Sequence, residues 1–339
     1  MKLNSILRGI AATVLALTAF GSQAQGLRIV TKDGAETLIP YTELDYVGTY
    51  GETAEQADPK VGDYFYSDGT WSDGGLVSIE PDGRNAIWAE NRPEPIAGKT
   101  VVGIVFTTNP DRIADADKEA GYTHGYVIGC KNITDPKKSN YAKFPETVWY
   151  GGQYTVVNVI SVSKTAKTCY ENLKGREETT TLLEKNDPKY YDEDLPMFYN
   201  GTTLYPVAAP ENTSGWFIPS VGQMWDCVAN FCSGEVAEYL AENQTNTSDF
   251  TYTVSKNDLT TSPFEIFMEA FKKVPDADKD EITMNDGSAK DPYISLGTSS
   301  RYDTESRVII NLGMTGNGLV EGMAEWFDGD VHARPILAF

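Results

Sequence analysis

The sequence predicts an α+β fold, in which strands come first, helices follow and strands return at the end. Short apolar segments typical of strands occur up to about residue 130. Helical patterns with recognisable start signals lie between residues 155 and 271, and apolar strand patterns reappear after residue 305. This order favours segregated helices and strands over the regular alternation of a parallel α/β sheet.

The first elements form a small N-terminal segment. Two apolar runs, residues 27–30 and 37–39, flank the Asp33-Gly34 pair, which is typical of a β-hairpin. A unit of this size is unlikely to be stable alone. The polar, acidic residues 51–59 then indicate a linker. We therefore assign residues 25–58 to an N-terminal β segment with its linker and residues 59–339 to the main domain.

The main domain is expected to begin with strands. Residues 61–75 alternate aromatic and polar side chains around Asp68-Gly69, which predicts strand, turn and strand. Residues 101–107 and 125–130 are nearly continuous apolar runs and predict two buried strands.

The middle of the chain is expected to be helical. A helix is predicted within residues 155–173, whereas residues 171–194 carry eight acids against four bases and predict an exposed charged insertion. Ser220 and Gln223 have the spacing of a capping box, so a helix should start there and run to about Cys232.

A second helix start and a closing strand complete the pattern. Ser262, with Pro263 and Glu265, predicts another capped helix. The side chains that follow it at helical spacing predict a core-facing stripe, namely Phe264, Phe267, Met268 and Phe271. Residues 308–310 and 335–339 predict strands, with Pro335 at a strand start or a sheet edge.

The N-terminus has the features of a secretory signal peptide, which we place at residues 1–24. Lys2 and Arg8 precede the apolar run 10–20, and small residues follow at 22 and 24. The run is too short to span a bilayer, and no later stretch is long and apolar enough. We expect an exported protein, in the periplasm, at the cell surface or outside the cell, that does not span the membrane.

Four cysteines, Cys130, Cys169, Cys227 and Cys232, leave the redox state open. An even number in an exported chain permits disulfides, while four free buried thiols are an equal alternative. Cys227 and Cys232 lie five residues apart on one predicted helix and point about 140° apart, so they should not bridge each other.

The charge excludes several classes of partner. Lys and Arg number 28 and Asp and Glu number 49, giving a net charge of −21. So acidic a chain should be repelled by nucleic acid and by anionic lipid headgroups. With only His124 and His332 present, a multi-histidine site is excluded, and we predict structural roles for both.

No motif predicts a cofactor or a metal. Asp276, Asp278 and Asp280 begin like a calcium loop, but Glu281 stands where the turn glycine is needed and Gly287 where the bidentate acid is needed. We therefore predict a solvated acidic loop. The absence of a Cys-x-x-Cys motif gives no support for structural zinc.

Several segments together resemble the major-paralogous and DUF1566-like group of exported Bacteroidetes proteins. The most specific is Gly215-Trp216-Phe217-Ile218-Pro219-Ser220, within residues 210–224. The others are residues 27–47, 61–72, 99–106, 124–128 and 333–339. The resemblance implies a C-type-lectin-like domain over residues 59–339. The calcium motifs of the sugar-binding lectins are not matched, because the nearest strings begin at Glu94 and Met284.

The same resemblance implies a ligand site in the loops before the closing strands. By position these loops supply Ser299, Arg301, Tyr302, Asn317, Trp326 and Phe327. Tyr, Arg and Trp are frequent interface anchors, although the same residues could equally cover the core.

We therefore expect a non-enzymatic binding or adhesion module that recognises a glycan or a surface or host protein. One alternative is a carbohydrate-active enzyme with a carboxylate pair, since 49 acids allow many pairs, and another is a structural component of a surface assembly. Trp71, Trp216 and Trp326 could each stack on a sugar, but packing is the commoner role.

Overall fold

The computed structural model divides the chain into two compact units, Met1–Asp58 and Pro59–Phe339. It describes residues 26–30, 36–40, 57–79, 86–134, 147–149, 157–232, 235–250, 262–282, 293–313, 320–326 and 330–339. In the first unit, β1 (Gly26–Val30) and β2 (Glu36–Pro40) pair antiparallel, with Leu27 opposite Ile39. The predicted pair of N-terminal strands is confirmed.

The second unit contains two five-stranded sheets. The first sheet has the order β14 (Ile336–Ala338), β8 (Tyr126–Gly129), β7 (Val101–Thr107), β3 (Tyr64–Tyr66) and β4 (Trp71–Ser72), and all neighbours are antiparallel. The second has the order β12 (Val320–Trp326), β11 (Ser306–Gly313), β10 (Tyr293–Arg301), β13 (Asp330–His332) and β9 (Thr147–Trp149). A short hairpin of β5 (Leu76–Ile79) and β6 (Ala86–Trp88) stands apart from both sheets.

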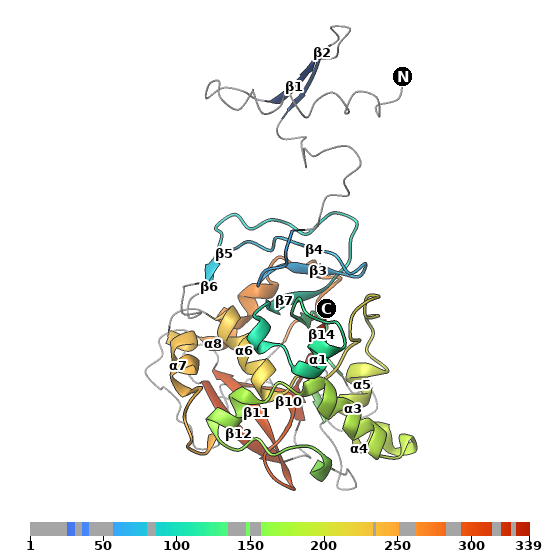
Figure 1. The fold of residues 1–339 in the computed structure, drawn as a ribbon, viewed down its shortest axis with the longest axis vertical. Coiled ribbons are helices and arrows are strands. Elements are labelled where there is room, and N and C mark those ends of the chain that lie inside the picture. The colour runs from blue at the N-terminus through green and yellow to red at the C-terminus, as the bar shows by residue number, and fades with distance from the viewer. Residues whose placement is uncertain are drawn as a thin grey trace. The chain divides into compact units, whose positions relative to one another are not determined.

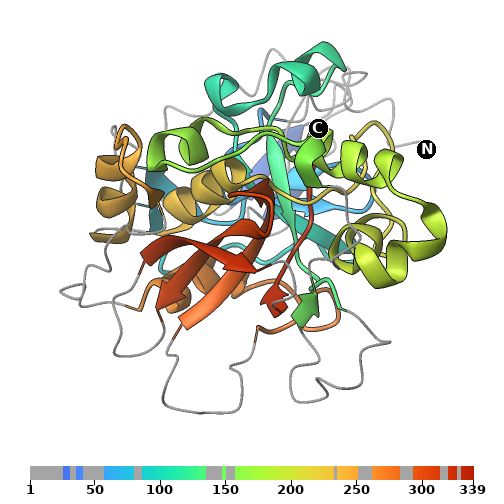
Figure 2. The ribbon, with the colours of Figure 1, turned by 90° about the horizontal axis from the view of Figure 1, so that it is seen from below.

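The described helices are mostly short. They are α1 (Asp115–Glu119), α2 (Ala166–Glu171), α3 (Gly175–Lys185), α4 (Tyr191–Asp194), α5 (Pro196–Thr202), α6 (Val221–Phe231), α7 (Glu235–Asn243) and α8 (Pro263–Met268). In Figure 2 the orange and red strands of the second sheet lie beside a row of green and yellow helices. The fold is therefore α+β, as predicted. Within the described part of the chain, no helix combines the length and the apolar character needed to cross a membrane.

Helix α6 lies between the two sheets (Figure 1). It packs against β7 on one side and against β10 and β11 on the other, and nine of its eleven residues are buried. A helix that is apolar on nearly every side is typical of such a central position. The largest of its buried side chains, Trp225, stacks on Phe250 with ring centroids 5.1 Å apart.

The predicted capping box at the start of α6 is confirmed. The Ser220 hydroxyl accepts the Gln223 backbone N–H, and Gln223 Oε1 accepts the Ser220 N–H at 2.9 Å. The same Gln223 oxygen accepts the Gly175 N–H at 3.2 Å, which ties the first turn of α3 to the cap. A Cβ atom at Gly175 would lie only 2.3 Å from Gln223 Oε1, so this contact requires glycine.

The aromatic stripe after Ser262 lies in the core, as predicted. Phe264, Phe267 and Phe271 are buried, and Phe267 and Phe271 pack with ring centroids 5.8 Å apart. The stripe continues from α8 into a 3₁₀ turn, Glu269–Phe271. At the end of the chain, Pro335 directly precedes β14, which is an edge strand, so the prediction for Pro335 is also confirmed.

All four cysteines are free and buried. Removing a thiol from water disfavours its charged form. Burial raises the pKa of Cys130 to about 12, and it also raises the pKa of Cys169, Cys227 and Cys232. Of the two alternatives that the sequence left open, the structure has the free thiols.

The exposed insertion predicted at residues 171–194 is wrong for helix α3. Gly175, Glu178, Thr179 and Leu182 are buried, and the helix packs against β10. Glu178 Oε2 accepts the Ser299 hydroxyl at 2.5 Å, and Glu178 Oε1 accepts the Asn172 amide at 2.8 Å. Charge composition predicted exposure because it does not reveal which single carboxylate turns inward.

The solvated acidic loop predicted at Asp276, Asp278 and Asp280 is also wrong in part. Asp278 Oδ2 accepts the Val101 N–H at 3.0 Å, at the start of β7. Asp280 accepts both the Asn132 N–H and the Lys131 ammonium at 3.0 Å. Two of the three carboxylates therefore fasten the loop to the first sheet and to the segment after β8.

Glu178 makes the stability of the fold depend on pH. Burial raises the pKa of Glu178 from 4.5 to about 7, against the hydrogen bonds from Ser299, Asn172 and Ser300. The folded state therefore holds this proton more tightly than the unfolded chain. The stabilisation of the fold by protonated Glu178 is fully present below about pH 4.5 and is lost as the pH rises through about 7.

We predict that Glu178→Gln removes this loss of stability at rising pH. Relative to wild type, the variant should gain up to about 3 kcal/mol in free energy of unfolding between pH 4.5 and 7.5. Urea denaturation at both pH values measures the difference. The control is Glu184→Gln, an exposed carboxylate on the same helix, which should follow wild type. Parallel pH profiles for wild type and Glu178→Gln would contradict the assignment.

Candidate functional site

The structure separates the residues predicted to bind a ligand. Ser299 lies inside β10 and is fully buried, so its expected place in a ligand-contacting loop is corrected. Arg301 ends β10 and Tyr302 follows it, both half-buried, and the Tyr302 hydroxyl donates to Asp249 at 2.5 Å. Strand register brings Trp326 to the same end of this sheet, opposite Ser306.

The remaining predicted residues lie outside what the structure describes. Asn317, Phe327 and the side chain of Trp326 belong to this group. Of the two other tryptophans considered for sugar stacking, Trp216 is buried and donates from Nε1 to Val207 O at 2.8 Å. Trp71 packs against Phe339 with ring centroids 5.6 Å apart.

A cavity of about 180 Å³, which we call the polar pocket, lies on one side of α6. Its walls come from the end of β7, the 3₁₀ turn Pro110–Arg112, the end of α2, helix α6 and helix α7. The lining residues are Thr107, Asn109, Arg112, Tyr170, Trp225, Asp226, Ala229, Asn230, Ala237, Ala241 and Gln244.

An ion pair between Arg112 and Asp226 forms part of the pocket wall. Arg112 Nε donates to both Asp226 carboxylate oxygens, at 2.9 and 2.8 Å. Arg112 Nη2 donates to Tyr170 O at 2.8 Å, and the guanidinium carbon lies 3.8 Å from the centre of the Tyr170 ring. Arg112 therefore links the 3₁₀ turn, α2 and α6.

Burial and the guanidinium act on Asp226 in opposite directions. Removing the carboxyl from water raises the pKa of Asp226 to about 6, although the charge of Arg112 and its hydrogen bond lower it. The side chains of Arg112 and Asp226 are only 12% and 9% exposed. Above pH 6 the pair is therefore ionised on both sides and nearly enclosed by protein.

Three amide side chains in the wall have hydrogen-bonding capacity to spare. Asn109, which is exposed, uses Oδ1 to accept the Asp111 N–H, and its NH₂ group has no partner among the described residues. Asn230 uses Nδ2 to donate to Phe106 O at 2.8 Å, and its Oδ1 has no partner in the described part of the chain. Gln244 makes no side-chain hydrogen bond with the described residues and offers both groups.

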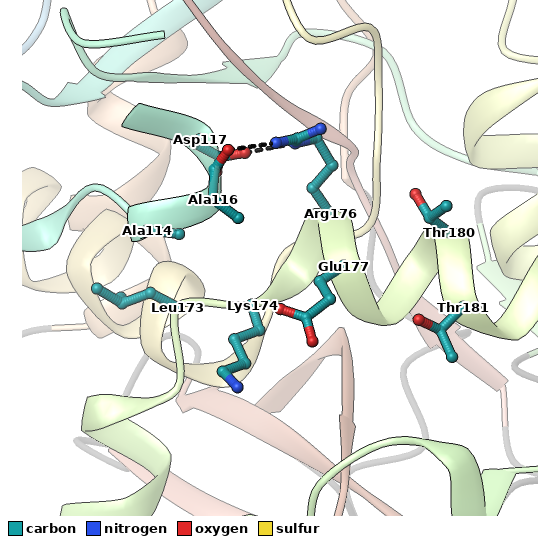
Figure 3. A pocket seen from close by; sticks show the side chains of 9 residues that line it. All are labelled: Ala114, Ala116, Asp117, Leu173, Lys174, Arg176, Glu177, Thr180 and Thr181. Atoms are coloured by element: carbon teal, nitrogen blue, oxygen red, sulfur yellow. Dashed lines mark hydrogen bonds and ion pairs between the residues drawn. The ribbon is translucent and has the colours of Figure 1, made fainter. Parts of the chain in front are cut away.

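A second cavity, of about 210 Å³, lies between α1 and the first turns of α3 (Figure 3). Arg176 pairs with Asp117 on one side of it, while Lys174 and Glu177 extend away from that pair. Alanine methyl groups, Leu173 and two threonines make up the rest of the lining. The side chains of Lys174, Glu177 and Thr180 in this lining are exposed, and the lining contains no amide side chain.

The polar pocket is equipped to bind and orient a ligand by hydrogen bonds. Its amides do not titrate, and its two charged side chains neutralise each other. Within the described residues, no group of three or more His, Cys, Asp or Glu side chains is placed to hold a metal ion.

Sequence patterns did not reveal this pocket, although one signal was present. Asp226 interrupts an otherwise apolar stretch of the helix, and a buried carboxylate needs a partner. Its partner Arg112 lies 114 residues away, so nothing local identified it.

The fold and the pocket together define an α+β protein with a small polar cavity. The chain matches no protein-family model and no curated protein. Among solved structures it is similar to a fimbrial protein from Bacteroides ovatus, at 16% identity and a TM-score of 0.46. The match covers 83% of this chain and 49% of that one, so it spans about half of that protein's length. Similarity at this level assigns neither fold nor function.

We predict that Arg112→Gln destabilises the protein because it leaves Asp226 buried without a cation. The expected cost at pH 7.5 is roughly 3–5 kcal/mol of unfolding free energy. The cost should shrink at pH 5, because loss of the guanidinium raises the pKa of Asp226 further and the carboxyl becomes neutral. Urea denaturation at the two pH values measures both effects.

The matched control is Lys118→Gln, which breaks the exposed Lys118–Asp115 pair at 2.9 Å. Exposed pairs contribute little, so this variant should stay close to wild type at both pH values. An equal loss of stability in the two variants would show that burial of Asp226 has no energetic consequence.

Proposed function

We propose that the protein is an exported, non-enzymatic binding module and that the polar pocket is its main ligand site. Unengaged amide groups of Asn109, Asn230 and Gln244 around one small cavity carry the proposal. Among the described residues these groups have no hydrogen-bond partner; Asn230 and Gln244 are half-buried and Asn109 is exposed, so all three can pair with a ligand in the cavity. The ligand is a glycan or a surface or host protein.

Export and the C-type-lectin-like identity of the Pro59–Phe339 unit belong to the same proposal. Their support is the signal-like sequence of residues 1–24 and the sequence resemblance described above. Arg301, the last residue of β10, and Tyr302, which follows it, form the competing site, at one end of the second sheet. Neither residue lines the polar pocket, so substitutions test the two sites separately.

An array experiment tests this function. The exported chain is applied to immobilised glycans and host surface proteins, and we expect reproducible binding to a restricted set. Gln244→Ala should weaken that binding about tenfold, as expected for the loss of one or two ligand hydrogen bonds. Glu238→Ala, at an exposed position on the same helix, should leave it unchanged.

Tyr302→Ala distinguishes the two sites. If the polar pocket holds the ligand, Tyr302→Ala binds like wild type. Loss of binding in Tyr302→Ala with none in Gln244→Ala would move the site to the end of β10. Turnover of an arrayed glycan, or no binding at all, would contradict the proposed function.

A further inference from the structure

We propose that the polar pocket binds a single neutral sugar residue of a glycan. This inference rests on the proposed function and narrows it from any ligand to one chemical class. It follows from the size of the cavity, the arrangement of polar and apolar groups in its wall, and its charge.

The size of the cavity limits the ligand to one small ring. Its volume of about 180 Å³ is below the ~300–1,000 Å³ of pockets that enclose drug-sized molecules. An oligosaccharide or a folded peptide could therefore place only one unit inside. The rest of such a ligand would lie on the surface outside.

The polar groups of the wall fit hydroxyls. Asn109 offers N–H donors, Asn230 offers a carbonyl acceptor, and Gln244 offers both. A hydroxyl donates one hydrogen bond and accepts two, so neighbouring hydroxyls on a ring can pair with such a mixed set. A ligand group that only donates or only accepts would leave part of the set unpaired.

Another part of the wall is apolar and suits the C–H face of a sugar ring. Ala229, Ala237 and Ala241 contribute methyl groups from α6 and α7. Tyr170 adds a half-buried aromatic ring, whose T-shaped contact with Trp225 at 5.9 Å fixes its orientation. A sugar ring has both polar and apolar faces, and this wall offers a partner to each.

The charge of the pocket selects against acidic sugars. Arg112 is the cation of the lining. Its Nε–H donates to both oxygens of Asp226, and its Nη2 donates to Tyr170 O. Asp226 already neutralises this cation, so an anionic ligand would meet a compensated charge in the pocket and a chain of net charge −21 around it. A neutral sugar makes its hydrogen bonds without disturbing the pair.

The experiment titrates the whole exported chain with methyl glycosides. The neutral panel contains glucose, galactose, mannose and N-acetylglucosamine, and the acidic panel contains glucuronic acid and N-acetylneuraminic acid. Saturation-transfer NMR and calorimetry measure binding. We expect at least one neutral glycoside to bind at least tenfold more tightly than either acidic sugar, with no change when a calcium chelator is added.

Asn109→Asp is the most informative variant. Aspartate keeps the oxygen that caps the 3₁₀ turn but loses the N–H donors, so the fold is retained while a ligand contact is lost. We expect roughly tenfold weaker sugar binding in Asn109→Asp and in Gln244→Ala. Glu238→Gln, at an exposed position on α7, should bind like wild type.

Four results would overturn the inference. Preferential binding of an acidic sugar would contradict the neutral ligand class. Binding of a neutral sugar that both pocket variants leave unchanged would contradict the site. If no sugar binds but an arrayed protein does, and Gln244→Ala weakens that binding, the sugar inference fails while the proposed function stands. If nothing binds in either experiment, both fail.

Discussion

The burial of helix α6 is the constraint on which most of the Pro59–Phe339 unit depends. Nine of its eleven residues are buried, and it packs against strands of both sheets. Apolar residues gain from that position, but each polar group on the helix loses water and must find a partner in the protein. The surrounding elements supply these partners.

Different elements meet this need at the start and in the middle of the helix. At the start, Gln223 completes the cap with Ser220 and also holds Gly175 of α3. In the middle, Arg112 neutralises Asp226 and reaches across to the backbone of Tyr170. The polar pocket lies beside the second of these contacts, so Arg112 and Asp226, which stabilise the fold, also form part of its wall.

Local signals in the sequence were sufficient where the physics is local. A capping box acts within four residues, so Ser220 and Gln223 located the start of α6. The apolar run at residues 101–107 coincides with β7, which is buried along its whole length. The burial of helix α3 was not predicted because its buried face is mostly polar. Gly175, Glu178 and Thr179 lie on that face at helical spacing but contribute little hydrophobicity. In a sequence, polar residues on a buried helix face show the same pattern as those on an exposed face, because their hydrogen-bond partners lie elsewhere in the chain.

The sequence by itself determined the class of fold, most strands, the starts of α6 and α8, and the acidic character of the chain. These follow from periodicity, caps and composition, which are properties of neighbouring residues. Only the tertiary structure decided which charges are buried and where a polar cavity forms. Glu178 meets Ser299 across 121 residues, and Arg112 meets Asp226 across 114. Such pairings depend on how the elements pack, because a buried charge is stable only where a distant partner is brought to it.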